Sequence, residues 1–243
     1  MITLYQFRHS AFCLKTRMAL HAKKLTYRIE EVKPGIGQIE IFKISGQKKL
    51  PVIMDDNNQI INDSTNICEY IDKKNDFNKL LPLDPIEFAQ AKLFEDWADT
   101  TMASLCKKAL IRAALENTKL RIVLLPDDIP ASIKGIFNKI PFKRFDQLSN
   151  IVLSYKNNIE FQKILESLSK GLINKKFLIG NSLSIADISV ASQLSLLKFP
   201  SSSGNDLSGE GCPEFINNPY LDNLFQWRDK LEENLFSAYS PDI

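Results

Sequence analysis

The stretch that decides the fold is Ile2-Thr-Leu-Tyr-Gln-Phe-Arg-His-Ser-Ala-Phe-Cys-Leu-Lys-Thr-Arg-Met-Ala-Leu20. Residues 2–7 are largely apolar and rich in strand formers, and the three residues that follow them are polar. From Phe12 onward, apolar residues recur at helical spacing. The pattern predicts a strand, a loop and a helix, with Ser10 at or next to the helix N-cap.

The residues that follow continue this alternation of strands and helices. Further strands are expected at about 26–32, 51–54 and 59–61, with a short helix near 39–43 and a longer one from 64 to about 73. Asp55-Asp-Asn-Asn58 is typical of a hairpin turn, because Asp and Asn tolerate the dihedral angles of tight turns. The predicted order of elements is βαβαββα, which indicates an α/β domain.

A proline-containing segment, Leu80-Leu-Pro-Leu-Asp-Pro85, interrupts this pattern, since proline lacks an amide hydrogen and disfavours helix in the residue before it. We place the domain boundary here, with one domain at 1–82 and a second at 83–243. The second domain is helical in character, with helices expected at about 85–117, 145–172, 184–197 and 220–234. The stretches 124–141 and 199–219 contain prolines or glycines and are expected to be ordered loops.

Composition and charge narrow the class of protein. The formal charge of +2 results from 31 basic and 29 acidic residues, which leaves no global field for binding nucleic acid or anionic lipid. There is no signal-peptide pattern at the start and no run of about 20 apolar residues, so we expect neither secretion nor a membrane span. The four cysteines form no CxxC pair and no zinc spacing, so we expect no metal site and a cytoplasmic, reducing location.

Three short motifs could carry chemistry. Ser10 would bring a hydroxyl to a helix start, where free amides and the helix dipole favour a thiolate. In Lys49-Leu50-Pro51-Val52, a cis peptide before the proline would turn the Leu50 backbone outward, able to pair with an extended peptide. Asp63-Ser64 offers an acid and a hydroxyl at another helix start, a place suited to an amine and a carboxylate. Each motif alone is also explained by a turn or a helix cap.

Taken together, these three motifs resemble the thioredoxin-like domain of glutathione transferases. The resemblance implies a thioredoxin-like domain followed by an all-α domain that contributes the pocket for a second substrate, glutathione as co-substrate, and a homodimer. It also implies that Ser10 faces the thiol of glutathione, that Leu50 pairs with its cysteinyl backbone, and that Asp63 and Ser64 hold its γ-glutamyl group. Pro51 is counted among the glutathione-binding residues.

Two further residue assignments and one folding motif follow from the same resemblance. Lys49 is the expected ligand of the glycyl carboxylate, with Lys48 as its close competitor, and Phe12 is counted among the glutathione-binding residues. Phe177-Leu-Ile-Gly-Asn-Ser-Leu-Ser-Ile-Ala-Asp187 is similar to the family's capping-box segment, in which Ser184 caps a helix and Asp187 lies three residues on. We assign this motif a role in folding and none in catalysis.

Three functional interpretations remain open. The first is a transferase that conjugates the glutathione thiolate to a small electrophile, with Ser10 as the catalytic residue. The second is a glutathione-dependent thiol transferase or reductase that forms a mixed disulfide on Cys13, and the third is a weakly active glutathione-binding module. The redox branches of the family have a cysteine where Ser10 stands here, which favours the first interpretation.

Two observations qualify the site. Ala11 replaces a proline found in many relatives, and a cysteine in Cys13's position is usually a small buried hydrophobe.

Overall fold

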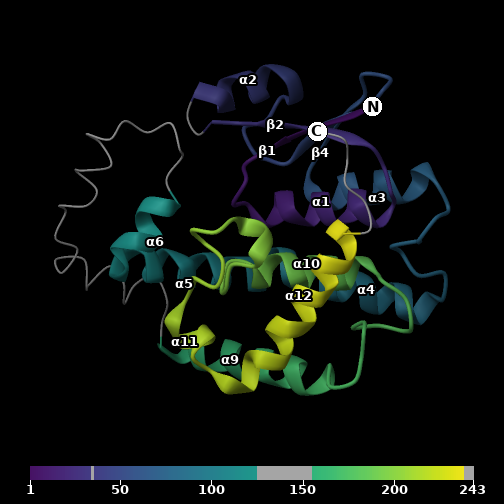
Figure 1. Cartoon of the computed structure of the whole chain (residues 1–243). Helices are drawn as coiled ribbons and strands as arrows, with labels where there is room; N and C mark the ends of the chain where they lie inside the picture. Colours follow the sequence, from purple (N-terminus) through teal and green to yellow (C-terminus); the bar gives the residue numbers. More distant parts are fainter. Residues whose placement is uncertain (34–35, 125–154, 238–243) are drawn as a thin grey trace. The chain divides into compact units, whose positions relative to one another are not determined.

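The computed structural model describes residues 1–33, 36–124 and 155–237, so the loop expected at 124–141 lies almost wholly outside the described residues. These residues, which are drawn in colour in Figure 1, form two compact units. The first contains 1–33, 36–99, 176–192 and 230–237, and the second contains 100–124, 155–175 and 193–229. The first unit extends beyond residue 82, and the domain boundary at 82–83 stays a prediction.

The first unit begins with the predicted βαβαββα order and is therefore a thioredoxin-like α/β fold. Its elements are β1 (Ile2–Gln6), α1 (Ala11–Ala22), β2 (Tyr27–Glu31), α2 (Ile36–Ser45), β3 (Val52–Met54), β4 (Ile60–Asn62) and α3 (Ser64–Lys74). The strands form one sheet in the order β2-β1-β3-β4. β1 is parallel to β2, which requires the α1 crossover, whereas the β1–β3 and β3–β4 pairs are antiparallel.

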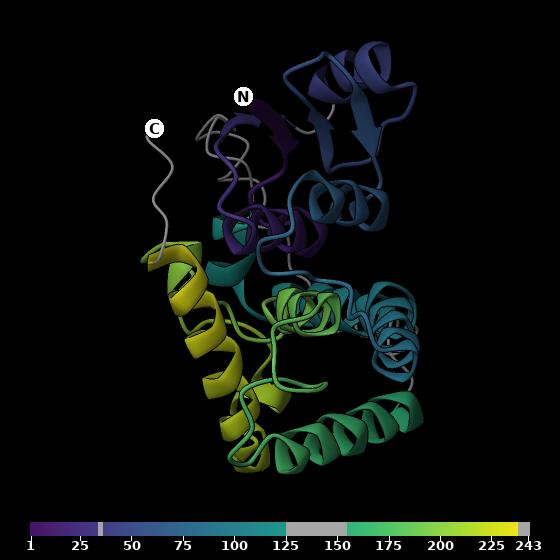
Figure 2. The ribbon, with the colours of Figure 1, turned by 90° about the vertical axis from the view of Figure 1, so that its right-hand side faces the viewer.

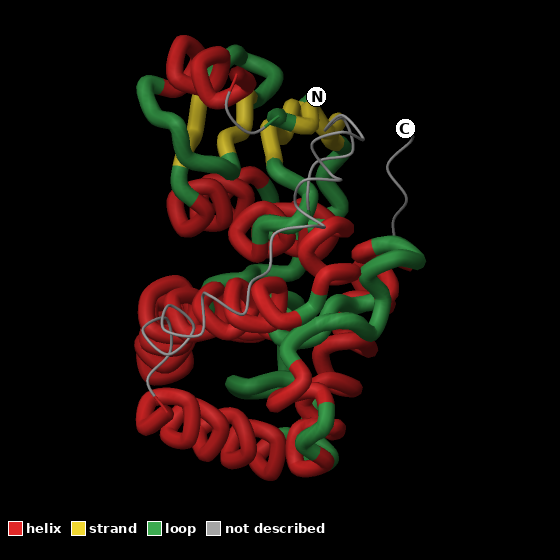
Figure 3. Tube along the Cα trace, turned by 90° about the vertical axis from the view of Figure 1, so that its left-hand side faces the viewer, coloured by secondary structure: helices red, strands yellow, loops and turns green. Residues whose placement is uncertain are grey.

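Helices cover both faces of this sheet. Figure 2 shows α2 on one face and α1 with α3 on the other, and Figure 3 shows the strands between these helical layers. On the α2 side, Ile41 packs with Val32 and Val52 in a buried apolar cluster. On the opposite side, α1 buries Leu14 and Met18. The helix α2 extends beyond the predicted 39–43 at both ends.

A buried ion pair between Lys23 and Asp72 holds the segment that follows α3 in place. The Lys23 ammonium lies 3.0 Å from Asp72 Oδ1 and donates a hydrogen bond of 2.8 Å to the Asn75 carbonyl. The same Asp72 oxygen accepts the Leu80 amide at 2.8 Å. Because Lys23 ends α1 and Asp72 belongs to α3, this pair fixes where the proline-containing segment begins.

The half of the predicted capping box in which Asp187 bonds back to Ser184 is confirmed at the start of α10 (Ile185–Leu194). Asp187 Oδ2 accepts both the amide of Ser184, at 2.8 Å, and its hydroxyl, at 2.9 Å. Its other oxygen accepts the Leu178 amide at 2.7 Å. Burial raises the pKa of Asp187 to about 6, although these hydrogen bonds act in the opposite direction.

The helical region departs from the prediction in three places. The helix expected at 85–117 consists of α4 (Pro85–Trp97), a π-helical turn (Ala98–Met102) and α5 (Ala103–Glu116). Two short helices were not expected, α6 (Thr118–Val123) and α11 (Pro213–Ile216), because elements of four to six residues are too short to show a period. A short 3-10 turn, Ser201–Ser203, also lies in the expected loop.

The second unit also includes α9 (Tyr155–Gly171) and the beginning of α12 (Asp222–Ser237), which follows a 3-10 turn at Pro219–Leu221. Its core contains an edge-to-face contact between Phe161 of α9 and Phe215 of α11, with ring centroids 5.7 Å apart. None of the helices among the described residues has both the length and the apolar character needed to cross a membrane.

We expect Asp187→Ala to lower the free energy of unfolding by about 2 to 4 kcal/mol, because it leaves the donors of buried Ser184 and half-buried Leu178 without an acceptor. Urea titration monitored by circular dichroism measures this. The control is Glu233→Ala, which removes an exposed carboxylate on α12. Equal stability of the two variants would show that the capping box contributes nothing to folding.

Candidate functional site

Ser10 caps α1 through its hydroxyl oxygen, and its hydroxyl hydrogen remains available as a donor. Its backbone is extended, with φ −81° and ψ 122°, and its Oγ accepts the Cys13 amide at 3.4 Å. Its carbonyl accepts the Leu14 amide at 2.9 Å, as expected at an N-cap. Because a hydroxyl that accepts one bond can still donate its hydrogen, half-buried Ser10 offers a donor at the positive end of the helix dipole.

Cys13 lies in the first turn of α1 and is fully buried. Burial raises the pKa of the Cys13 thiol above its ordinary value, although the Ser10 hydroxyl and the charge of Arg17 act in the opposite direction. A thiol in this environment stays protonated at neutral pH, and only the thiolate is a good nucleophile. The helix start therefore carries an available hydroxyl and an unreactive thiol.

The Leu50–Pro51 peptide bond is cis, which confirms the sequence prediction. Pro51 is buried, and Leu50 packs against the apolar cluster on the α2 side of the sheet. Within the described residues, neither the amide nor the carbonyl of Leu50 has a hydrogen-bond partner. Lys48 and Lys49, directly before Leu50, are exposed. This segment therefore offers a free backbone edge next to two positive side chains.

Asp63 caps α3 in a left-handed backbone conformation, with φ 71°. Its Oδ1 accepts the amides of Thr65, at 3.0 Å, and Asn66, at 3.3 Å. Because both bonds go to Oδ1, the second carboxylate oxygen of this exposed residue remains available. The neighbouring Ser64 is buried at the first position of α3.

The register of the sheet brings the three motifs to one end of it. Val52 of β3 pairs with Tyr5 of β1 on one side and with Asn62 of β4 on the other. Ser10 follows β1, Pro51 precedes Val52, and Asp63 follows Asn62. Since β3 runs antiparallel to both neighbours, all three motifs leave the sheet at the same end.

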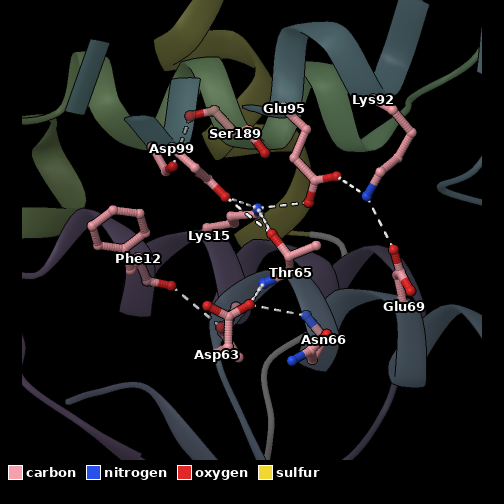
Figure 4. Close-up of polar contacts among 12 residues, drawn as sticks. Phe12, Lys15, Asp63, Thr65, Asn66, Glu69, Lys92, Glu95, Asp99 and Ser189 are labelled. Carbon is pink, nitrogen blue, oxygen red and sulfur yellow. Dashed lines mark hydrogen bonds and ion pairs between the residues drawn. The ribbon is translucent and has the colours of Figure 1, made fainter. Parts of the chain in front are cut away.

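The sequence prediction missed a buried charge cluster centred on Lys15, which is fully buried on α1 (Figure 4). The Lys15 ammonium donates to Glu95 Oε1 at 2.8 Å and to Asp99 Oδ2 at 2.6 Å. It also lies 3.3 Å from the Thr65 hydroxyl. Lys92 bonds the second oxygen of Glu95 at 2.5 Å and reaches Glu69 at 3.0 Å.

The ionisation of this cluster follows from its partners. Burial alone would lower the pKa of Lys15, but nearby Cys68, Asp99 and Glu95 shift it upward, so the ammonium stays charged. Burial also opposes ionisation of Glu95, yet the charges of Lys15 and Lys92 leave its pKa below the ordinary value. A signal for this cluster existed in the sequence: Lys15 falls on the apolar stripe of α1, where only a paired lysine is stable.

The cluster consists of lysine ammonium groups paired with Glu and Asp carboxylates. Over the part of the chain that is described, no group of three or more His, Cys, Asp or Glu side chains is placed to hold a metal ion.

Comparison with known proteins points to one family. Residues 4–79 match the family model for the N-terminal domain of glutathione S-transferases. The chain is 29% identical over 135 residues to glutathione S-transferase U1 of Arabidopsis thaliana, which covers 53% of this chain and 60% of that protein. It is 24% identical over 153 residues to a stringent starvation protein A homologue of Pasteurella multocida, covering 61% and 68%.

A solved structure extends the likeness in fold over nearly the whole chain. A glutathione S-transferase from Methylobacillus flagellatus, solved with GSH bound, superimposes with a TM-score of 0.60 at 16% identity and covers 97% of this chain and 98% of its own. The match over residues 4–79 and the similarity to these relatives point to the glutathione S-transferase superfamily. The chain's sequence match spans 60% of the length of the Arabidopsis relative.

We expect all four thiols to react slowly with an aromatic disulfide reagent in the folded protein, because Cys13, Cys68, Cys106 and Cys212 are at most 2% exposed. In concentrated guanidinium all four should react rapidly. The control is Ser10→Cys, which should add one rapidly reacting thiol at the half-exposed helix start. Rapid reaction of Cys13 in the folded wild type would contradict its burial.

Proposed function

We propose that the chain is a glutathione transferase that binds glutathione at the end of the sheet where Ser10, Leu50 and Asp63 meet, and that it joins the glutathione sulfur to a small electrophile. The observation that carries this proposal is the row Tyr5–Val52–Asn62, because its register gathers the three motifs. The match of residues 4–79 to the glutathione S-transferase family model and a neighbour solved with GSH bound support glutathione as the ligand.

The proposed contacts follow from the groups that are available. The free backbone of Leu50, next to Pro51, would pair with the cysteinyl residue of glutathione. Asp63 Oδ2 would accept from the γ-glutamyl amine, and the amides at the start of α3 with the Ser64 hydroxyl would bind its carboxylate. Lys49, or its neighbour Lys48, would bind the glycyl carboxylate, and Phe12 would lie beside the ligand.

In the proposed reaction, the bound thiol loses its proton to solvent, and the Ser10 hydroxyl donates a hydrogen bond to the resulting thiolate. The start of α1 adds its positive dipole, which lowers the thiol pKa further. The sulfur lone pair then forms a bond to the electrophilic atom, whose leaving group or displaced π-electrons take the negative charge. No side chain needs to act as a general base, because the thiolate is populated before the electrophile arrives.

Two alternatives make different demands on the same site. A thiol transferase would need Cys13 as an accessible thiolate, and its complete burial and raised pKa speak against that role. A weakly active glutathione-binding module would keep the same contacts without conjugation. It is the second candidate because the chain is also similar to a stringent starvation protein A homologue, which is not named as a transferase. Activity measurements separate it from the transferase.

We further propose that the protein is a cytoplasmic homodimer that acts away from membranes and nucleic acid. The four cysteines are free thiols, which fits a reducing compartment. Ile86 and Leu93 are 68% and 71% exposed on α4, and such apolar residues are available to a second copy of the chain. Equilibrium sedimentation of the wild type and of Leu93→Glu would test the homodimer.

The catalytic proposal is tested by replacing Ser10. We expect Ser10→Ala to lower kcat/KM for conjugation about 10- to 100-fold and to shift its pH profile upward, because the hydroxyl no longer stabilises the thiolate. Ser10→Asp is the matched control for helix capping, since Asp caps as well as Ser but cannot donate a hydrogen bond when ionised. It should be stable and nearly inactive.

Cys13→Ala completes this test, because it removes the only thiol in the active-site segment. We expect it to leave conjugation nearly unchanged. Efficient reduction of mixed disulfides by the wild type, with loss of that activity in Cys13→Ala, would establish the thiol transferase instead.

Glutathione binding is tested at Asp63. We expect Asp63→Asn to weaken glutathione binding about tenfold by calorimetry, because the charge facing the γ-glutamyl amine is lost while a capping oxygen remains. The matched control is Asp84→Asn, since Asp84 caps α4 in the same manner, accepting the amides of Ile86 and Glu87. Equal affinity of the two variants would contradict the proposed site.

A further inference from the structure

The buried cluster around Lys15 connects two parts of the proposed glutathione site, and the inference drawn from it rests on that proposed function. Lys15 lies on α1 little more than one turn after Ser10. Thr65, which it contacts, follows Asp63-Ser64 directly in the first turn of α3. One buried side chain thus links the helix start that carries Ser10 to the helix start that carries Asp63.

Both the backbone amide and the side-chain hydroxyl of Thr65 donate hydrogen bonds. Its amide donates to Asp63 Oδ1 at 3.0 Å, and its hydroxyl donates to Asp99 Oδ2 at 3.1 Å (Figure 4). The Lys15 ammonium donates to the same Asp99 oxygen at 2.6 Å. Lys15, Thr65 and Asp99 therefore form a closed set of contacts beside the turn in which Asp63 takes its left-handed conformation, which L-residues adopt rarely.

The charge of Lys15 is what allows this arrangement to be buried. Lys15 is the cation that contacts both Glu95 and Asp99, whereas Lys92 contacts Glu95 and Glu69. Without Lys15, Asp99 would be a largely buried carboxylate with no cation in contact, and it would take up a proton or turn away. A side chain that turns away would remove the acceptor that orients Thr65, and a protonated one would be a weaker, uncharged acceptor.

We propose that Lys15 is a positioning residue for the γ-glutamyl end of glutathione, and that it acts through Thr65 on Asp63 and Ser64 without touching the ligand. The consequence is specific to one part of the ligand. Loss of the Lys15–Thr65–Asp99 contacts should weaken recognition of the γ-glutamyl group and leave the cysteinylglycine part, recognised near Leu50 and Lys49, unaffected.

The experiment compares glutathione with cysteinylglycine, which lacks the γ-glutamyl group, by titration calorimetry and competition. Thr65→Val keeps the shape of the side chain and removes its hydroxyl, and it should weaken glutathione binding about tenfold without changing cysteinylglycine binding. Thr65→Ser, which retains the hydroxyl, is the matched control. Thermal unfolding shows that each variant is folded at the temperature of the titration.

Lys15 is tested in the same way. Lys15→Met should weaken glutathione binding about tenfold without changing cysteinylglycine binding, as Thr65→Val does. Lys15→Arg, which keeps the positive charge, should retain the glutathione affinity of the wild type. Lys92→Met is the control, because Lys92 bonds Glu95 but contacts neither Thr65 nor Asp99. If Lys15→Met does not fold, Thr65→Val alone decides the outcome.

The outcomes separate the two proposals. A wild type that does not bind glutathione overturns the proposed function and this inference with it. A wild type that binds glutathione, with Thr65→Val and folded Lys15→Met equally tight, overturns only the positioning role. Equal weakening of glutathione and cysteinylglycine also overturns it, since that result indicates a general loss of structure.

Discussion

The need to neutralise one buried ammonium group constrains much of the first unit. A charged lysine is tolerated in a core only with hydrogen-bonded partners of opposite charge, because desolvation would otherwise outweigh any gain from packing. Lys15 occurs on the buried face of α1, and α4 and the π-helical turn after it supply Glu95 and Asp99. Thr65 adds α3 to the same contact. An apolar residue at this position could fill the space but would not specify how α1, α3 and α4 pair.

The second constraint is the register of the sheet, because it determines which helix starts lie at the same end of the sheet. The row Tyr5–Val52–Asn62 fixes the end at which β1 and β4 leave the sheet, and each strand is followed by a helix start. Helix starts attract negative charge, and glutathione carries two carboxylates and, in its reactive form, a thiolate. Two helix starts near the free backbone of Leu50 are thus suited to an extended, anionic tripeptide.

Features encoded locally could be predicted from the sequence. The four strands, the turn at Asp55–Asn58, the cis bond before Pro51 and the capping box at Ser184 each depend on a few neighbouring residues. The short helices α6 and α11 could not, since they span little more than one turn. The Lys15 cluster was missed because its partners lie far away in the chain, although a lysine on an apolar helical stripe is a sign that an acid must come from elsewhere.

Ser10 and Cys13 show why depth matters as much as position on a helix. Both belong to the start of α1, where amides and the dipole favour a negative charge. Cys13 lies one turn further in and is fully buried, and desolvation raises its pKa despite the bond from Ser10. A thiol brought by a ligand to the half-exposed side of Ser10 would experience the same dipole without that desolvation. The helix start therefore favours activation of a thiol that arrives from outside over use of the thiol within the chain.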